Sequence, residues 1–317
     1  MPLDPAFITD WGSAGIRLAT PLILATVGGV FAERSGVFNI GIEGMMLVGA
    51  FTAVATSYYL GASADPAVIS LLAAIAAMLA GGGIAFIHAF LTVTRRVDQI
   101  ITGAAINILA LGLTNTLFRA IWGETGRERV AGFPEVRVPV LADIPVVGPI
   151  LFQQSLIVFV AYFIPIIAAF VLFRTTWGLT IRAGGDFPLA VDTAGLSVTR
   201  VRYAAVLFGG AMAGLAGAAL ALGAVRYFTP GMTAGRGFIV LGAIVVGRWH
   251  PMIAAGACLL FGAADAFQLR AQALNLGIPY QFFIMLPYVL AVAAVAGAIG
   301  RASPPQQLGR PYRREAG

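Results

Sequence analysis

The residues best placed to do chemistry lie between Glu33 and Phe51, where the sequence reads ERSGVFNIGIEGMMLVGAF. This stretch sets an amide, Asn39, and a carboxylate, Glu43, among apolar residues and glycines. Polar groups in membrane-spanning segments usually face a cavity, a pathway or another helix, and glycines let a helix break or pack closely. We therefore predict that Asn39, Glu43 and Gly44 lie on a permeation pathway. A structural hydrogen bond between Glu43 and a neighbouring helix is the alternative.

Further polar residues are predicted to join that pathway. Asn107 lies in an apolar segment at 99–121, Asp265 lies in another at 252–271, and Arg236 opens a Gly-rich segment. A charge inside a span is a functional hypothesis by default. The alternatives are hydrogen bonds between helices for Asn107 and a pairing of Asp265 elsewhere in the bundle. Arg236 is expected at the external mouth of the pathway.

Composition indicates the class of protein. The 317-residue chain is 59% hydrophobic and 11% charged, whereas soluble domains carry about 25% charged residues. We therefore predict an all-α, polytopic membrane protein. The net charge of +6 comes from arginine alone, because the sequence has no lysine. These arginines lie at the ends of apolar segments and in the C-terminal tail, a pattern typical of membrane topology and contact with anionic lipid rather than nucleic acid.

Several catalytic chemistries lack the residues that they need. A P-loop requires a lysine that reaches the terminal phosphates of the nucleotide, and the chain has none. The two histidines, His88 and His250, do not have the spacing of a zinc hydrolase. The single cysteine, Cys258, cannot form a disulfide within the chain. We expect a protein that is not an enzyme, with no catalytic residue, cofactor or metal.

The apolar pattern predicts a helical bundle of eight to ten spans in one integral-membrane domain, 1–317. A span needs about 20 apolar residues, and the clear candidates are 13–32, 67–91, 99–121, 153–173, 203–225, 252–271 and 280–299. Two Gly-rich segments, 36–60 and 236–249, are interrupted, and each is either a full span or a broken helix. Arg248 and Trp249, at the end of the second, are typical of interfacial anchors.

Charge predicts which loops face the cytoplasm. The segments 174–203 and 301–317 and the Arg95-Arg96 turn are net basic, which places them inside by the positive-inside rule. The mixed-charge loop 122–152 is then extracytoplasmic. The N-terminus lies outside if 36–60 spans fully and inside if that segment re-enters.

The two interrupted segments show a weak internal repeat. GMMLVGA at Gly44–Ala50 aligns with GFIVLGA at Gly237–Ala243. Transporters are often built from duplicated halves, and paired interrupted segments in those halves indicate the substrate site. The pattern predicts pseudo-repeated halves. Chance similarity among apolar residues is the alternative.

Residues 174–203 are too polar to span and too apolar to be a free linker. The sequence predicts short helices at the membrane surface, with Pro188 at a helix start and Gly195 at a helix end. Such an element is suited to docking a cytoplasmic partner. A plain amphipathic connector is the alternative.

This segment resembles the cytoplasmic coupling loop of ABC importer permeases of the ribose/simple-sugar and nucleoside type. The Glu33–Met46 run is similar to the first-half signature of that family, and GMTAGRGFIVLGAIVVGRWHP at Gly231–Pro251 is similar to its second-half signature. The resemblance covers roughly residues 10 to 300, and the first signature looks closer to the nucleoside branch. Branched-chain amino-acid permeases share a related pattern and are the nearest alternative family.

The resemblance implies the permease subunit of an ATP-driven importer in the plasma (inner) membrane, which translocates a nucleoside or simple sugar by alternating access. Its implied partners are cytoplasmic ATP-hydrolysing subunits, a second permease that is a homologous chain or a second copy, and an extracytoplasmic substrate-binding protein. The residues implied to couple to the ATPase are Arg182, Gly184, Asp192, Thr193, Ala194 and Gly195. The alternatives are an ion-coupled secondary transporter, with Glu43 and Asp265 as ion carriers, and a non-transporting scaffold.

Overall fold

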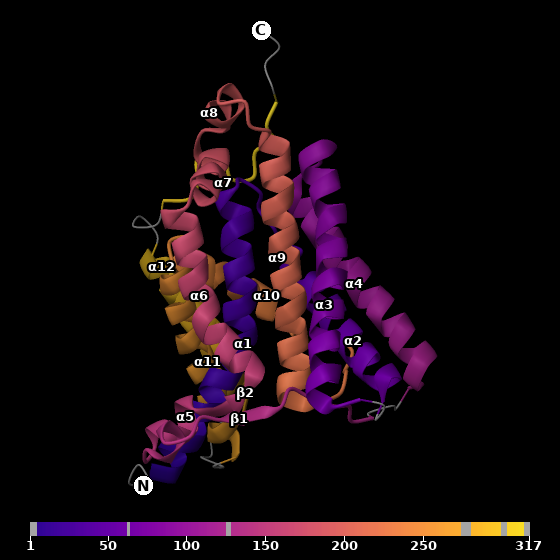
Figure 1. The fold of residues 1–317 in the computed structure, drawn as a ribbon, viewed down its shortest axis with the longest axis vertical. Helices are drawn as coiled ribbons and strands as arrows, with labels where there is room; N and C mark the ends of the chain where they lie inside the picture. The colour runs from indigo at the N-terminus through magenta and orange to yellow at the C-terminus, as the bar shows by residue number, and fades with distance from the viewer. Residues whose placement is uncertain (1–4, 62–63, 125–127, 274–279, 299–302, 314–317) are drawn as a thin grey trace.

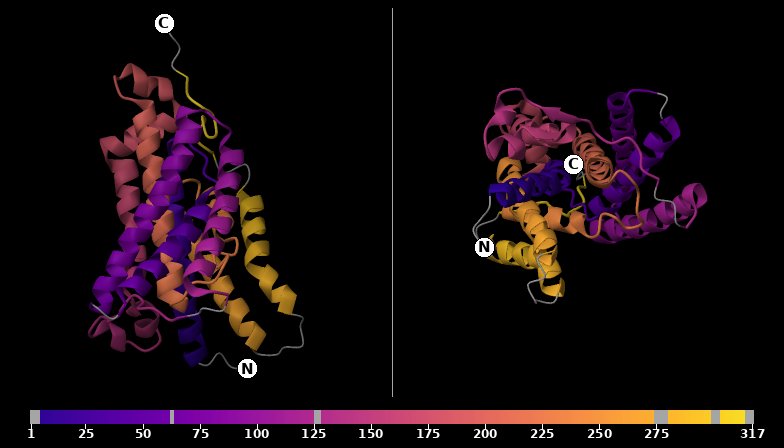
Figure 2. Two further views of the ribbon diagram at one scale, coloured as in Figure 1. Left: turned by 90° about the vertical axis from the view of Figure 1, so that its right-hand side faces the viewer. Right: turned by 90° about the horizontal axis from the view of Figure 1, so that it is seen from below.

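The computed structural model describes residues 5–61, 64–124, 128–273, 280–298 and 303–313. Most of them lie in helices, and the long helices run along the long axis of the molecule (Figure 1 and Figure 2). The bundle consists of α1 (Pro5–Arg34), α2 (Ile42–Leu60), α3 (Pro66–Ala89), α4 (Gln99–Trp122), α6 (Leu156–Arg174), α9 (Val198–Leu220), α10 (Arg236–Val246), α11 (Pro251–Ala273) and α12 (Tyr280–Ala298). Two π-helical turns, η1 (Phe90–Thr94) and η3 (Ala221–Val225), extend α3 and α9.

The helices confirm the predicted class of an all-α, polytopic membrane protein. Among the described residues, six helices are long and apolar enough to cross a membrane, namely α1, α3 with η1, α4, α6, α9 with η3, and α11. Arg236–Val246 and Met285–Gly297 are shorter apolar helical segments. Six of the seven clear candidate spans from the sequence correspond to these six long helices. The seventh, 280–299, corresponds to α12, whose apolar segment Met285–Gly297 is shorter.

Small elements cover the two ends of the bundle (Figure 1). One end, here called the α7–α8 end, carries α7 (Thr176–Asp186), α8 (Pro188–Thr193) and the C-terminal segment 303–313. The other, the β1–β2 end, carries η2 (Leu141–Asp143), α5 (Val147–Leu151) and the antiparallel strands β1 (Glu135–Arg137) and β2 (Gln153–Ser155). The start of α1 also lies at the β1–β2 end.

The two interrupted segments have different lengths in the structure. After a non-helical turn that follows α1, α2 runs back to the β1–β2 end, where Ser57 donates a hydrogen bond to the carbonyl of Ala131 at 3.0 Å. In contrast, α10 has 11 residues and covers only part of the bundle before the chain turns into α11. The segment 36–60 therefore crosses the bundle, and the segment 236–249 is a half-length helix.

Short local signals fix where the helices begin. Asp98 accepts hydrogen bonds from the backbone N–H groups of Ile100 and Ile101 at 2.9 Å, so it caps α4, as expected for an aspartate at this position. Pro188 is the first residue of α8, and Gly195 lies just beyond its end with φ +79°. Both helix-end assignments made from the sequence are confirmed.

Glycines bring α9 close to its neighbours. A Cβ atom on Gly214 would overlap the backbone of Ala77 in α3, and a Cβ atom on Gly217 would overlap the backbone of Met46 in α2. Without side chains at these positions the backbones come into direct contact, which is how small residues drive helix association in membranes. The centre of the bundle is therefore packed backbone against backbone.

The bundle contains two inverted halves. Helices α1 and α9 pack antiparallel, and their neighbours correspond: α1 contacts α10 and α11, and α9 contacts α2 and α3. The remaining pairs also correspond, because α2 packs on α4 and α10 packs on α12. The two sets of contacts therefore match with the chain direction reversed, which is the arrangement of inverted repeats in transporters. The sequence repeat at Gly44 and Gly237 pairs α2 with α10 in the same way.

Candidate functional site

The carboxylate of Glu43 binds the N-terminus of α10. Its Oε1 accepts a hydrogen bond from the N–H of Gly235 at 2.8 Å, and its Oε2 accepts one from the N–H of Gly237 at 2.6 Å. The first turn of a helix has unpaired N–H groups and a partial positive charge, so it binds anions well. A Cβ atom on Gly237 would lie 2.6 Å from Glu43 Cα, which explains why a glycine is needed there. The half that contains α2 thus supplies the carboxylate, and the half that contains α10 supplies the N–H donors.

Asn107 of α4 holds the start of α2. Its Oδ1 accepts a hydrogen bond from the N–H of Gly44 at 2.8 Å, and its Nδ2 donates one to the carbonyl of Ile40 at 3.1 Å. Asn39, in the same turn, is buried, and its Oδ1 has no hydrogen-bond partner within the described residues. The predicted pathway residues Asn39, Glu43, Gly44 and Asn107 therefore lie around one junction of α2, α4 and α10.

Arg236 and Asp265 form an ion pair next to this junction. Arg236 Nη2 lies 3.2 Å from Asp265 Oδ2, and each side chain is about a quarter exposed or less. The pair lines a cavity of about 200 Å³ between α1, α10, α11 and α12, whose other lining residues are Leu22, Ala234, Ile239, Phe261, Gln268, Pro287 and Tyr288. With a donor, an acceptor and an amide in an otherwise largely apolar wall, this cavity suits a neutral molecule that carries hydroxyl or amide groups.

The structure joins these two groups of residues. Glu43 binds the residues on either side of Arg236, which in turn pairs with Asp265. All six predicted pathway residues therefore lie in or beside one polar network. Their role in transport stays a prediction, because several of them are already engaged in hydrogen bonds between helices.

The predicted coupling residues fall into two groups at the α7–α8 end. Thr193, Ala194 and Gly195 are exposed at the tip of α8, and Asp192 beside them is half-buried. Arg182 and Gly184 lie on α7 and face the bundle, where the Gly184 carbonyl accepts a hydrogen bond from Arg202 at 3.4 Å. Of these six residues, Thr193, Ala194 and Gly195 at the tip of α8 are the exposed ones.

Arg202 is a structural residue that the sequence did not reveal. It is 1% exposed, and it donates hydrogen bonds to the carbonyls of Ser35 at 3.1 Å and Arg310 at 2.9 Å, besides that of Gly184. It thus ties α1, α7 and the C-terminal segment together. No sequence signal separates it from the exposed Arg200, since both are arginines at the start of one span.

The C-terminal segment lies across α7 and α8 as a strap, defined here as residues 303–313. The N–H of Gln307 donates to the carbonyl of Gly185 at 2.8 Å, and the N–H of Gly309 donates to that of Gly36 at 3.1 Å. The hydroxyl of Tyr312 donates to Asp192 Oδ2 at 3.0 Å. A basic tail was expected here, and the structure adds that its backbone holds the surface elements in place.

The interpretation of Trp249 as an interfacial anchor is wrong. Its side chain is 4% exposed, and its indole N–H donates a hydrogen bond to Glu33 Oε2 at 2.5 Å. Consecutive left-handed residues, Arg248 at φ +53° and Trp249 at φ +54°, turn the indole inward. The two signature segments of the sequence therefore meet here as well as at Glu43.

Comparison with known proteins places the chain in a family. The family model described as "Branched-chain amino acid transport system / permease component" matches residues 13–295. The guanosine ABC transporter permease protein NupQ of Bacillus subtilis is 41% identical over 94% of this chain and 95% of its own length. The nucleoside ABC transporter permease protein NupC of Lactococcus lactis is 36% identical over 93% of both chains. The glucose ABC transporter permease protein TsgB13 of Haloferax volcanii is 33% identical over 73% of this chain and 62% of its own.

No solved structure gave a significant match. The family model, the relatives and the spanning helices agree on a multi-pass protein of the plasma membrane, and the predicted resemblance to ABC permeases is confirmed. The chain belongs to the family of permease components of the branched-chain amino acid transport system type, and it is the permease component of an ABC transporter.

Proposed function

We propose that this chain is the membrane-spanning subunit of an ATP-driven importer that translocates nucleosides by alternating access. The observation that supports nucleosides as the cargo is the 41% identity to a guanosine permease along nearly the whole of both chains. The polar groups of the cavity beside Arg236 and Asp265 match the chemistry of this cargo class, because nucleosides are neutral and rich in hydroxyl and amide groups. A simple sugar is the second candidate, favoured by the similarity to a glucose permease.

The α7–α8 end is proposed to face the cytoplasm and to carry the contact with a separate ATP-hydrolysing subunit. Arginines gather at this end, in agreement with the positive-inside rule; they include Arg95, Arg96, Arg174, Arg182, Arg200, Arg248, Arg310 and Arg313. The tip of α8, from Asp192 to Gly195, would be the contact itself, with Leu189 and Leu196 exposed on either side of it. The β1–β2 end, with the loop 122–152, would receive a substrate-binding protein.

A second permease subunit is proposed to complete the pathway. Closed two-fold assemblies are the commonest form of oligomer, and α4 presents a large apolar face, with Ile101, Ile108 and Leu109 more than half exposed. The partner would be either a homologous chain or a second copy of this one. ATP binding and hydrolysis on the separate subunits would move α7 and α8 and open the assembly to each side in turn.

The ion-coupled alternative fits the contacts less well. An ion carrier needs a carboxylate that can be loaded and released. Glu43 is bound to two backbone N–H groups, and Asp265 is paired with Arg236. Neither carboxylate is free in this arrangement, which favours transport driven from the cytoplasmic subunits.

Uptake of labelled guanosine by cells that produce the complete set of subunits tests the cargo. We expect unlabelled nucleosides to compete and glucose not to compete. Uptake of labelled glucose by the same cells, with no uptake of labelled guanosine, would replace the nucleoside proposal with the sugar.

Co-purification of an ATP-hydrolysing subunit from gently solubilised membranes tests the coupling contact. We expect Ala194→Trp at the tip of α8 to abolish co-purification, because the bulky tryptophan side chain would block the proposed contact with the ATPase subunit. Ala67→Trp, on an exposed alanine near the β1–β2 end, is the matched control and should retain the subunit. Equal recovery from both variants would remove α8 from the contact.

A further inference from the structure

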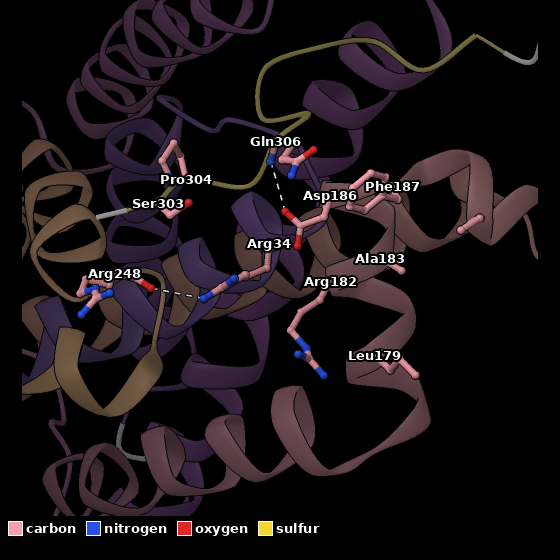
Figure 3. Close-up of a pocket in the computed structure, with 11 residues that line it drawn as sticks. Arg34, Leu179, Arg182, Ala183, Asp186, Phe187, Arg248, Ser303, Pro304 and Gln306 are labelled. Carbon is pink, nitrogen blue, oxygen red and sulfur yellow. Dashed lines mark hydrogen bonds between the residues drawn. The ribbon is translucent and has the colours of Figure 1, made fainter. Parts of the chain in front are cut away.

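A cavity of about 670 Å³ opens at the α7–α8 end, between the end of α1, α7, the turn that joins α10 to α11, and the strap (Figure 3). Three of its lining residues are arginines, Arg34, Arg182 and Arg248, and the acid among them is Asp186. The other lining residues are Leu179, Ala183, Phe187, Ala190, Ser303, Pro304 and Gln306. The wall therefore carries an excess of positive charge.

The positive charges are held close together. The guanidinium groups of Arg34 and Arg182 both lie over the ring of Phe173, at 5.8 Å and 5.1 Å from its centre. Arg34 is fixed there by hydrogen bonds to the carbonyls of Trp249 at 3.0 Å and Arg248 at 3.2 Å. A cation–π contact attracts a cation but does not neutralise it. Like charges gathered in one wall repel one another, and one carboxylate, Asp186, offsets only part of three positive charges.

The arginines retain donors that the protein does not use. Arg182 Nε is buried without a hydrogen-bond partner among the described residues. Neither Arg182 nor Arg248 takes part in an ion pair within the part of the chain that the structure describes. Asp186 Oδ1 is already engaged, since it accepts a hydrogen bond from the N–H of Gln306 at 3.2 Å. Planar guanidinium groups match the oxygen atoms of phosphate particularly well.

The rim of the cavity is apolar. Leu179 is 57% exposed and Phe187 is 61% exposed, and both line the cavity. The site also lies at the end of the spanning helix α1, the depth at which lipid headgroups meet a membrane protein. A charged interior with an apolar rim suits an amphiphile better than a small ion.

We propose that this cavity binds a phosphate-bearing anion, with the phosphate between Arg34, Arg182 and Arg248 and any acyl chains against Leu179 and Phe187. The same chemistry is offered by the headgroup of an anionic phospholipid and by free phosphate, and the apolar rim favours the lipid. Binding here does not depend on which cargo the importer carries. An anion in the cavity would hold α7 against the end of α1, and it would thereby set the position of the surface elements.

The test measures the thermal stability of the purified full-length chain in phosphatidylcholine nanodiscs, titrated with phosphatidylglycerol or with inorganic phosphate. The pocket variant is Arg182→Gln/Arg248→Gln. The control variant is Arg95→Gln/Arg200→Gln, which removes the same charge from exposed arginines at the same end, outside the cavity. We expect a saturable stabilisation by phosphatidylglycerol in the wild type and in the control. In the pocket variant, the phosphatidylglycerol content that gives half of the maximal stabilisation should rise at least roughly tenfold, because charge-assisted hydrogen bonds to the phosphate are lost.

Each outcome decides the proposal. A stabilisation by inorganic phosphate that shows the same dependence on the pocket would keep the anion site and replace the lipid with free phosphate. Equal responses from the pocket and control variants would show that only general surface charge acts, and they would overturn the site. An absence of any pocket-dependent response to either probe would also overturn it, and would leave the cavity to the ATPase contact. If the double variant does not fold, Arg248→Gln alone answers the question, because that side chain is exposed.

Discussion

At the scale of single residues, a substitution of Glu43 can distinguish a structural role from a direct role in transport. Its two carboxylate oxygens bind two N–H groups of the opposite half. A glutamine has one acceptor oxygen, so its amide NH₂ would face one of those N–H groups. We expect Glu43→Gln to lower the free energy of unfolding by about 2 kcal/mol, the range of one charge-assisted hydrogen bond. Thermal unfolding in detergent, together with uptake in cells, checks this.

The control for Glu43→Gln is Glu128→Gln, which makes the same change on an exposed residue at the β1–β2 end. The two readings of Glu43 give different results. A pure loss of uptake with unchanged stability would mean that Glu43 acts on the cargo. A combined loss of stability and uptake would support the junction that the contacts describe.

At the scale of elements, the three consecutive glycines of α3 offer a test of helix packing within one turn. A Cβ atom on Gly81 would overlap the carbonyl oxygen of Gly210, whereas nothing lies within 4 Å of a Cβ atom on Gly83. We expect Gly81→Ala to destabilise the bundle by about 1–3 kcal/mol through overpacking. Gly83→Ala should be neutral or slightly stabilising, because alanine favours the helix. Size-exclusion profiles after heating distinguish the two, and similar profiles would contradict the close α3–α9 contact.

The strap is the second element whose role can be measured. Deletion of the chain from Ser303 onward removes its hydrogen bonds to Gly36, Gly185 and Asp192. We expect faster amide hydrogen exchange in α7 and α8, because local openings are more frequent where anchoring contacts are lost. Uptake should fall while membrane insertion is unaffected. Tyr312→Phe, which removes one hydroxyl, should lower the free energy of unfolding by only about 1 kcal/mol. Unchanged amide exchange in α7 and α8 after the full deletion would show that the strap does not hold these helices in place.

The elements also show what a sequence can and cannot predict here. The span positions, the helix start at Pro188 and the end at Gly195 follow from local chemistry and were predicted. The lengths of α2 and α10 were not, because the glycines that interrupt both segments occur equally in packed and in broken helices. The binding of Arg202 to three carbonyls could not be predicted from the sequence. Every residue has a backbone carbonyl, and the fold alone determines which carbonyls lie near the Arg202 guanidinium.

At the scale of the whole molecule, the orientation in the membrane is open to a direct test. The single native cysteine, Cys258, is 0% exposed, so the unmodified chain gives a low background with a membrane-impermeant maleimide. We expect Glu128→Cys, at the β1–β2 end, to be labelled on intact cells. Arg313→Cys, in the strap, should be labelled only after permeabilisation. The reverse pattern would invert the proposed orientation and place α8 outside, away from any ATPase.

The inverted halves suggest how such a molecule changes shape. In transporters built from inverted repeats, one repeat moves against the other and opens the site to each side of the membrane in turn. The matching contacts of α1 and α9 lead us to expect motion of this kind here. The junction of Glu43 with α10 lies where the halves meet, and we expect its hydrogen bonds to persist during such motion.

The binding of Glu43 to a helix N-terminus has an electrical consequence. A mobile unit charge in a membrane responds to voltage by about 2.3 kcal/mol per 100 mV. Glu43 is held by two backbone N–H groups at the start of α10, and Asp265 is paired with Arg236, so neither carboxylate is free to move with the cargo. A neutral cargo would then cross without a current, and the membrane potential would neither drive nor oppose its passage through this chain.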